Sequence, residues 1–203
     1  MATAIEALGL TKSYQSGKGK VVQAVRGIDL AVHTGEIFAL LGPNGAGKTS
    51  TIEILEGYRS RDAGTLSVLG EDPAQTNLPA WRNRVGIVLQ STKDAADLSV
   101  LEILSHFARY YSNPRDIEEV IAAVGLTEKR HSRAEHLSGG QRRRLDVALG
   151  IIGNPELLFL DEPTTGFDPE ARRAFWELIR TLRNQGTTIL MSTHYLDEAE
   201  ALA

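Results

Sequence analysis

Cysteine is absent from the 203-residue sequence, which excludes disulfide bonds and metal sites built on thiolates. Long hydrophobic runs are also missing, since apolar stretches such as 147–152 and 157–160 fall far short of the ~20 residues that a membrane-spanning helix needs. The N-terminus has no basic segment followed by an apolar stretch, as a secretory signal would. We therefore expect a soluble intracellular chain, for which any role at a membrane comes through a partner.

A surplus of basic residues is lacking as well. The sequence has 26 acidic residues against 22 lysines and arginines, which gives a formal net charge of −4. This balance argues against non-specific binding to nucleic acid, although a local basic patch stays compatible with it. The length suits one domain that buries roughly 70% of its unfolded surface, so the fold needs no covalent cross-link.

A glycine-rich stretch lies between an apolar run at 37–41 and a helix-like segment that begins near Gly47. Residues 42–49 follow the spacing G-x-x-x-x-G-K-T of a phosphate-binding loop, whose glycines let successive N–H groups form an anion nest. Lys48 would supply a full charge for the phosphates, and Thr49 a hydroxyl for Mg²⁺. An ordinary strand-to-helix turn is the alternative, but the complete pattern in this context favours phosphate binding. The expected nucleotide contacts are Gly42, Pro43, Asn44, Gly45, Ala46, Gly47, Lys48, Thr49 and Ser50.

Hydrophobic periodicity separates the chain into strand-rich and helix-rich parts. Strands are predicted at 4–10, 21–25, 28–32, 37–41, 65–69 and 85–89. A capping box at Ser99 and Glu102 then opens a helix, Gly125 ends a second, and no strand is readable between Gln90 and about residue 155. We therefore expect a single α/β domain over residues 1–203. Its core would cover about 1–90 and 155–203, and its helical subdomain about 91–154.

Polar residues follow several predicted buried strands, at the edge where α/β proteins place ligand contacts. Gln90 follows one such strand, and a solvated loop residue is an equally good interpretation of it. Asp161 and Glu162 follow another. An aspartate at the end of a buried strand beside a phosphate loop typically binds Mg²⁺ directly or through a water. The glutamate that follows it can deprotonate a water. We prefer these roles to the alternative that both residues are ordinary acids on the surface. His194 follows the last predicted strand, which favours a γ-phosphate contact over a merely hydrogen-bonded histidine.

A second glycine-rich helix start reads Leu-Ser-Gly-Gly-Gln-Arg-Arg-Arg at 137–144. Ser138 and Gln141 have capping-box spacing, and the two glycines between them leave bare N–H groups that suit an anion. The three consecutive arginines point in different directions on a helix, so we interpret them as a solvated face rather than a phosphate clamp. Further on, Asp168 followed by Pro169 predicts another capped helix.

The chain resembles the ATP-binding subunits of ABC transporters in its motifs and in their order. These are Gly-Pro-Asn-Gly-Ala-Gly-Lys-Thr at 42–49, Gln90, Leu-Ser-Gly-Gly-Gln at 137–141, Leu-Leu-Phe-Leu-Asp-Glu-Pro at 157–163, Asp168 and His194. The segments near Tyr14 and after His194 are most similar to ABC-2 type exporters of drugs and polysaccharides, which have separate permease subunits. Position alone favours a packing role for Tyr14. The resemblance reverses this and implies that Tyr14 stacks on adenine.

The resemblance implies a P-loop NTPase (RecA-like) core with an antiparallel β subdomain and an inserted helical subdomain. It also implies an ATPase that uses ATP and Mg²⁺, forms an ATP-dependent homodimer, and powers export through a transmembrane permease at the cytoplasmic face of the membrane. No nucleic-acid partner is expected. Family members continue past the helix after His194, so we expect the 203-residue chain to be truncated.

Individual roles come from the same resemblance. Glu162 would be the catalytic base and His194 the γ-phosphate switch, with Lys48 and Gln90 also in the catalytic set. The expected metal-binding residues are Thr49, Gln90 and Asp161, and Gln90 would also join the nucleotide site to the permease. The expected contacts across the dimer are Ser138, Gly139, Gly140 and Gln141, and Asp168 would lie in the loop between the two ATP sites.

Two other functions stay open as alternatives. A soluble ABC protein acting on ribosomes or nucleic acid would normally carry two such domains or a long coiled coil, and neither is present in this sequence. A module that binds ATP without turnover is disfavoured because Glu162 and His194 are both present.

Overall fold

The computed structural model describes residues 2–15, 19, 21–75, 79–88 and 97–202. The strands are β1 (Thr3–Gln15), β2 (Val21–His33), β3 (Ile37–Leu41), β4 (Ala63–Val68), β5 (Val85–Val88), β6 (Leu157–Asp161) and β7 (Thr188–Thr193). The helices are α1 (Lys48–Leu55), α2 (Pro79–Arg82), α3 (Val100–Ala108), α4 (Ile117–Ala123), α5 (Gly139–Ile151), α6 (Pro169–Asn184) and α7 (Leu196–Leu202), with short 3₁₀ helices η1 (Thr127–Lys129) and η2 (Ala134–His136).

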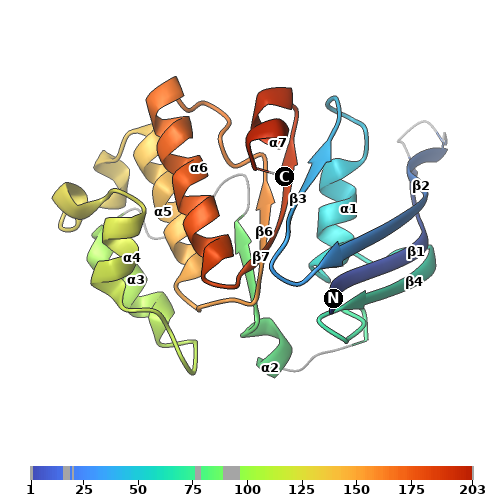
Figure 1. The fold of residues 1–203 in the computed structure, drawn as a ribbon, viewed down its shortest axis with the longest axis horizontal. Helices are drawn as coiled ribbons and strands as arrows, with labels where there is room; N and C mark the ends of the chain where they lie inside the picture. Colours follow the sequence, from blue (N-terminus) through green and yellow to red (C-terminus); the bar gives the residue numbers. More distant parts are fainter. Residues whose placement is uncertain (1, 16–18, 20, 76–78, 89–96, 203) are drawn as a thin grey trace.

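The strands form two sheets with α1 between them (Figure 1). The antiparallel sheet has the order β2-β1-β4, and the parallel sheet has the order β3-β7-β6-β5. Helices α5 and α6 cover the other face of the parallel sheet, with α3 and α4 beyond them (Figure 1). None of the helices in the described residues is long and apolar enough to span a bilayer.

Side chains of β6 alternate between two hydrophobic cores, as the twofold periodicity of a strand requires. Leu158 and Leu160 pack with helices α3 to α6, whereas Leu157 and Phe159 pack with α1 and the antiparallel sheet. All residues of β6 and β7 are buried, which is typical of parallel strands covered on both faces. The two strands are therefore held rigidly, and the polar residues that follow them emerge at one edge of the sheet.

The prediction of two strands at 21–25 and 28–32 was wrong, because β2 is continuous through them. The pairing of β1 with β2 shifts register at Gly27, whose φ of 80° lies in the left-handed region. A bulge there absorbs the glycine without ending the strand. Strand β1 also extends five residues beyond the predicted end at residue 10, to Gln15.

The segment between β5 and β6 is helical, as predicted. In its described part, residues 97–156, the structure contains helices and one isolated bridge pair but no strand. The predicted capping box is present: the Ser99 hydroxyl accepts from the Glu102 N–H at 3.3 Å, and the Glu102 carboxylate accepts from the Ser99 N–H at 2.8 Å. The boundaries of a helical subdomain at about residues 91 and 154 stay a prediction.

Candidate functional site

Residues 42–49 connect β3 to α1, and the backbone there requires glycine at two positions. Gly45 has a φ of 83° and Gly47 a φ of 96°, both in the left-handed region. A β-carbon at Gly47 would also lie 2.2 Å from the carbonyl oxygen of Ala24, so no larger residue fits. Gly47 is the N-cap of α1 and offers no side-chain acceptor, which leaves the first N–H groups of the helix available to an anion.

A pocket of about 430 Å³ opens beside this loop, within the usual size range of small-molecule sites. The half-buried ring of Tyr14 lies in its wall, and the Tyr14 hydroxyl donates to Ser50 Oγ at 3.2 Å. The fold thus brings the predicted aromatic residue to the predicted phosphate loop. The lining residues are Tyr14, Ala24, Asn44, Gly45, Gly47, Lys48, Thr49, Ser50 and Glu162.

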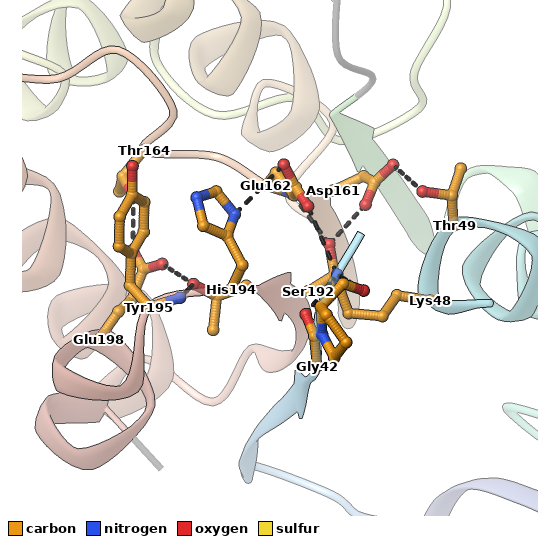
Figure 2. A network of polar contacts seen from close by, with 12 residues as sticks. Gly42, Lys48, Thr49, Asp161, Glu162, Thr164, Ser192, His194, Tyr195 and Glu198 are labelled. Carbon is orange, nitrogen blue, oxygen red and sulfur yellow. Dashed lines mark hydrogen bonds and ion pairs between the residues drawn. The ribbon is translucent and has the colours of Figure 1, made fainter. Parts of the chain in front are cut away.

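Lys48 is buried and turned back on its own loop. Its Nζ donates to the carbonyl oxygens of Gly42 at 2.7 Å and Pro43 at 3.2 Å, and lies 3.5 Å from Glu162 Oε1 (Figure 2). A buried ammonium group needs anionic or strongly polar partners, and phosphate oxygens would supply them better than carbonyl groups. The loop therefore holds a cation suited to a phosphate chain.

Thr49 and Asp161 meet at the carboxyl end of β6. The Thr49 hydroxyl donates to Asp161 Oδ2 at 3.0 Å, and the Ser192 hydroxyl donates to Asp161 Oδ1 (Figure 2). A hydroxyl and a carboxylate are the hard oxygen ligands that Mg²⁺ prefers, completed by waters and substrate phosphates. The described residues contain no cluster of three His, Cys, Asp or Glu side chains that could bind a metal without the substrate. Gln90, the third predicted metal ligand, lies outside the described residues.

Glu162 lies between Lys48 and His194. Its Oε1 is 3.5 Å from Lys48 Nζ, and its Oε2 is 3.5 Å from His194 Nδ1. Its φ of 46° is unusual for a residue with a side chain, and its N–H donates to the Ser192 hydroxyl at 3.0 Å. Because β6 ends at Asp161, this left-handed turn rather than strand alternation aims the carboxylate at the pocket. The two neighbouring acids therefore serve different parts of one site (Figure 2).

The family model described as ABC transporter matches residues 25–165, well over half of the chain. The chain belongs to the ABC transporter family. This match confirms the family that the sequence motifs predicted.

Curated relatives of this ABC chain carry the name Nod factor export ATP-binding protein I. The protein from Cupriavidus pinatubonensis (strain JMP 134 / LMG 1197) is 43% identical over 183 residues, which cover 88% of this chain and 56% of that protein. The protein from Rhizobium johnstonii is 42% identical over 205 residues, which cover 98% of this chain and 64% of that protein. The chain thus spans 56 to 64% of the length of these relatives.

Two ATP-binding cassettes of known structure share the fold. The cassette MJ0796, in a dimeric post-hydrolysis state bound to ADP and Pi, has a TM-score of 0.87 at 21% identity, covering 98% of this chain and 91% of that one. The cassette MJ1267 in its ADP conformation has a TM-score of 0.80 at 22% identity, covering 100% and 85%. At such identities the likeness shows the fold alone, and it confirms the predicted α/β class.

The interpretation of residues 142–144 as a solvated face was wrong for Arg143. Its guanidinium is buried and donates to the carbonyl oxygens of Asp161 at 2.7 Å and Pro163 at 3.0 Å. Burial lowers its pKa, although the nearby Asp146 carboxylate, at 3.9 Å, opposes the shift. Arg143 of this ABC chain thus supports the backbone that carries the two strand-end acids. Asp146, three residues on, was the one available sequence signal, since such spacing pairs charges on a helix.

Glu56, at the end of α1, is a further buried acid that the sequence did not single out. Desolvation by burial, followed by the charges of Asp161 and Glu53, raises its pKa from 4.5 to about 8. Nothing in the local sequence predicts this burial, because it depends on how α1 packs against the rest of the fold. The charge of Asp161 therefore reaches Glu56 and adds to the effect of burial on its pKa.

The second glycine-rich helix start forms as predicted but lies outside the pocket. Ser138 Oγ accepts from the Gln141 N–H at 3.3 Å, and Gln141 Oε1 accepts from the Ser138 N–H at 3.0 Å. Gly139 and Gly140 face open space, since a β-carbon at either position would have no atom within 4 Å. Asp168 caps α6 by accepting from the Ala171 N–H at 2.8 Å. None of these predicted nucleotide contacts lines the pocket beside Lys48, and their roles stay predictions.

Proposed function

We propose that this chain binds Mg-ATP in the pocket beside residues 42–49, hydrolyses it, and powers export through a separate transmembrane permease. One observation carries the proposal: the Glu162 carboxylate lies between Lys48 and His194, 3.5 Å from each, beside the Thr49–Asp161 pair. This arrangement combines a phosphate-binding cation, a metal-binding pair and a base in one pocket. The names of the curated relatives, export ATP-binding proteins, support the transport half of the proposal.

Binding of ATP divides among the residues of the pocket. Lys48 exchanges its loop carbonyls for the β- and γ-phosphates, and the N–H groups at the start of α1 hold the same oxygens. The exposed part of Tyr14 offers a ring face to adenine. Thr49 and Asp161 would hold Mg²⁺, which when bound would neutralise charge on the phosphates.

Hydrolysis requires a base close to the γ-phosphate. Asp161 is engaged by Thr49 and Ser192 on the metal side, so Glu162 is the carboxylate that accepts the proton of the attacking water. His194, on the other side of Glu162, donates a hydrogen bond to the γ-phosphate. Gln90 would connect these events to the permease.

A second copy of the chain completes each site. The bare helix start at Ser138 and Gly139 of one copy closes on the γ-phosphate held by the other, with Asp168 near the seam between the two sites. ADP lacks that phosphate, so hydrolysis opens the dimer and drives the permease between two states. In this arrangement the chain sits at the cytoplasmic face of the membrane, attached through the permease.

The first test is Mg²⁺-dependent ATP hydrolysis by the purified wild-type chain. We expect phosphate release with Mg²⁺, none with a chelator, and loss of release in Asp161→Asn but not in Asp116→Asn, a helix-capping aspartate far along the chain. Absence of hydrolysis in the wild type would contradict the ATPase proposal. Purification from native membranes should then yield a multi-span protein together with the chain, and a chain recovered only from ribosomes would contradict the transport proposal.

A further inference from the structure

Glu198 on α7 is buried, with 1% of its surface exposed, and its carboxylate accepts hydrogen bonds from three separate segments. The Thr164 hydroxyl donates to Oε1 at 2.9 Å, the Trp176 indole donates to the same oxygen at 3.3 Å, and the Thr193 hydroxyl donates to Oε2 at 2.5 Å. Figure 2 shows Thr164 and Glu198 near the Glu162–His194 pair. Hydrogen bonds to a buried carboxylate are among the strong ones in proteins.

The two threonines flank the proposed catalytic residues. Thr164 lies two residues after Glu162, and Thr193 comes directly before His194. The carboxylate of Glu198 therefore connects the loop that carries the proposed base to the strand end that carries the histidine. The Thr193 hydroxyl also accepts from the N–H of Tyr195, the residue before α7, at 3.0 Å.

Glu162 needs such support because of its backbone. A residue with a side chain persists at a φ of 46° only where its surroundings hold it there. The Ser192 hydroxyl holds the Glu162 N–H, and the Glu162 carbonyl accepts from the Thr165 N–H at 3.3 Å. Thr164, which lies inside that turn, is the residue that Glu198 fixes.

We infer that Glu198 is a positioning residue for hydrolysis: its carboxylate ties Thr164 to Thr193 and thereby sets the Glu162–His194 pair across the γ-phosphate. The inference rests on the proposed function. Without the carboxylate, the buried hydroxyls of Thr164 and Thr193 and the half-buried indole of Trp176 lose their common acceptor, and the two segments can separate. The nucleotide pocket itself stays intact, because none of the residues that line it belongs to this network. The loss should therefore fall on the rate and not on ATP binding.

The test uses variants that each alter this network at one residue. Thr193→Val and Thr164→Val remove one donor each, and Glu198→Gln keeps the shape of the side chain but replaces one acceptor oxygen by an N–H donor group. The matched control is Thr188→Val, at the other end of β7. Thr188 is fully buried and its hydroxyl accepts from the Gly35 N–H at 2.9 Å, far from the pocket residues.

We expect kcat to fall about 10- to 100-fold in the three network variants, since small displacements of reacting groups have effects of this size. KM and the affinity for labelled ATP should change less than about twofold, because the phosphate contacts remain. Thr193→Ser and Thr164→Ser, which keep the hydroxyl, should restore kcat. Thr188→Val should lower the thermal midpoint to a similar extent while kcat stays at the wild-type value.

Equal kcat in Thr193→Val and wild type would overturn the inference. It would also be overturned if Thr188→Val had the same thermal midpoint as the network variants and lost as much kcat as they do. Thr193→Val keeps the test decisive if Glu198→Gln does not fold. The premise is checked separately: wild type must hydrolyse ATP and Glu162→Gln must not. If wild type and Glu162→Gln behave as proposed but the network variants keep their kcat, only this inference fails. If the wild type does not hydrolyse ATP, the proposed function fails and this inference fails with it.

Discussion

The two glycine-rich helix starts of this chain, at 42–49 and at 138–141, differ in what surrounds them. The first lies at the edge of the parallel sheet, next to a buried lysine and the acids that follow β6. The second begins α5 and is capped by its own Ser138 and Gln141, with no acid in its first turn and open space beside both glycines. Both offer backbone N–H groups, but among the described residues only the first has the hydroxyl–carboxylate pair of Thr49 and Asp161 and the Glu162 carboxylate beside it.

The difference teaches that a helix start binds an anion by its backbone and becomes catalytic only through side chains brought by other elements. In the first site these arrive from β6, β7 and the segments that follow them, which the parallel sheet aligns. In the part of the chain that the structure describes, residues 138–141 do not line the pocket that Glu162, from the segment after β6, lines together with Lys48. We propose that residues 42–49 and the side chains beside them bind nucleotide and that residues 138–141 complete the site of a second copy, and the predictions below test this contrast.

Removing the base should have the largest effect. Glu162→Gln keeps the size of the side chain but not its basicity, and we expect kcat to fall about 10²- to 10⁴-fold with ATP binding retained. Glu156→Gln is the matched control, since Glu156 precedes the same strand at its other end and pairs with Arg84. If Glu162 instead binds Mg²⁺, ATP affinity will weaken in parallel with the rate. Near-normal turnover would contradict both roles.

Removing the cation should have the next largest effect. Lys48→Ala should weaken ATP binding about 10- to 100-fold, the usual range for charged hydrogen bonds, as measured by titration with labelled ATP in Mg²⁺. The exposed Lys129→Ala, in η1, should bind like the wild type. Unchanged affinity in Lys48→Ala would mean that the loop alone holds the phosphates and that the contrast with residues 138–141 is smaller than we state.

A pH dependence of stability should follow from Glu56, the buried acid at the end of the helix that the first loop begins. Because the pKa of Glu56 is raised from 4.5 to about 8, the folded state keeps a proton that the unfolded state releases between these values. The free energy of unfolding therefore falls as pH rises through this window, by at most about 1.4 kcal/mol per pH unit from this group. Glu56→Gln should flatten the dependence in urea unfolding, whereas the exposed Glu118→Gln should leave it unchanged. Parallel curves for wild type and Glu56→Gln would sink the prediction.

The smallest expected effect distinguishes a serine that only caps a helix from one that also takes part in ATP-driven association. Ser99 and Ser138 both head capping boxes, so Ser99→Ala and Ser138→Ala should each lower stability by about 1 kcal/mol. Only Ser138→Ala should also weaken ATP-driven association, because α3 begins with buried Val100 and offers no bare glycine start. Equal effects of the two changes on association would mean that the second helix start is no more than a capped helix.

Local chemistry made much of this structure predictable. The capping boxes at Ser99 and Ser138, the Asp168 cap and the buried strand that ends at Asp161 depend on neighbours within a few residues, and all four are present. The spacing of residues 42–49 likewise located the loop, because the left-handed φ of 96° at Gly47 belongs to the turn itself and requires glycine.

Features that depend on distant contacts escaped prediction. Arg143 looked like one of three solvated arginines until the fold placed the Asp161 carbonyl beside it. Glu198 lies among the acidic residues of 197–200, and nothing local marks it, because its three donors come from segments up to 34 residues away in the sequence. The continuity of β2 through Gly27 was missed because bulge pairing depends on the partner strand β1.

The most direct test of the contrast is whether the two helix starts meet across ATP. Light scattering on Glu162→Gln should detect a dimer in Mg-ATP and a monomer in Mg-ADP. Adding Ser138→Arg should abolish the dimer by steric and charge conflict, while adding Ser99→Arg at the other capping box should not. A dimer that persists in ADP, or one that survives Ser138→Arg, would contradict the account, because residues 138–141 would then not complete the site at Lys48 of the partner copy.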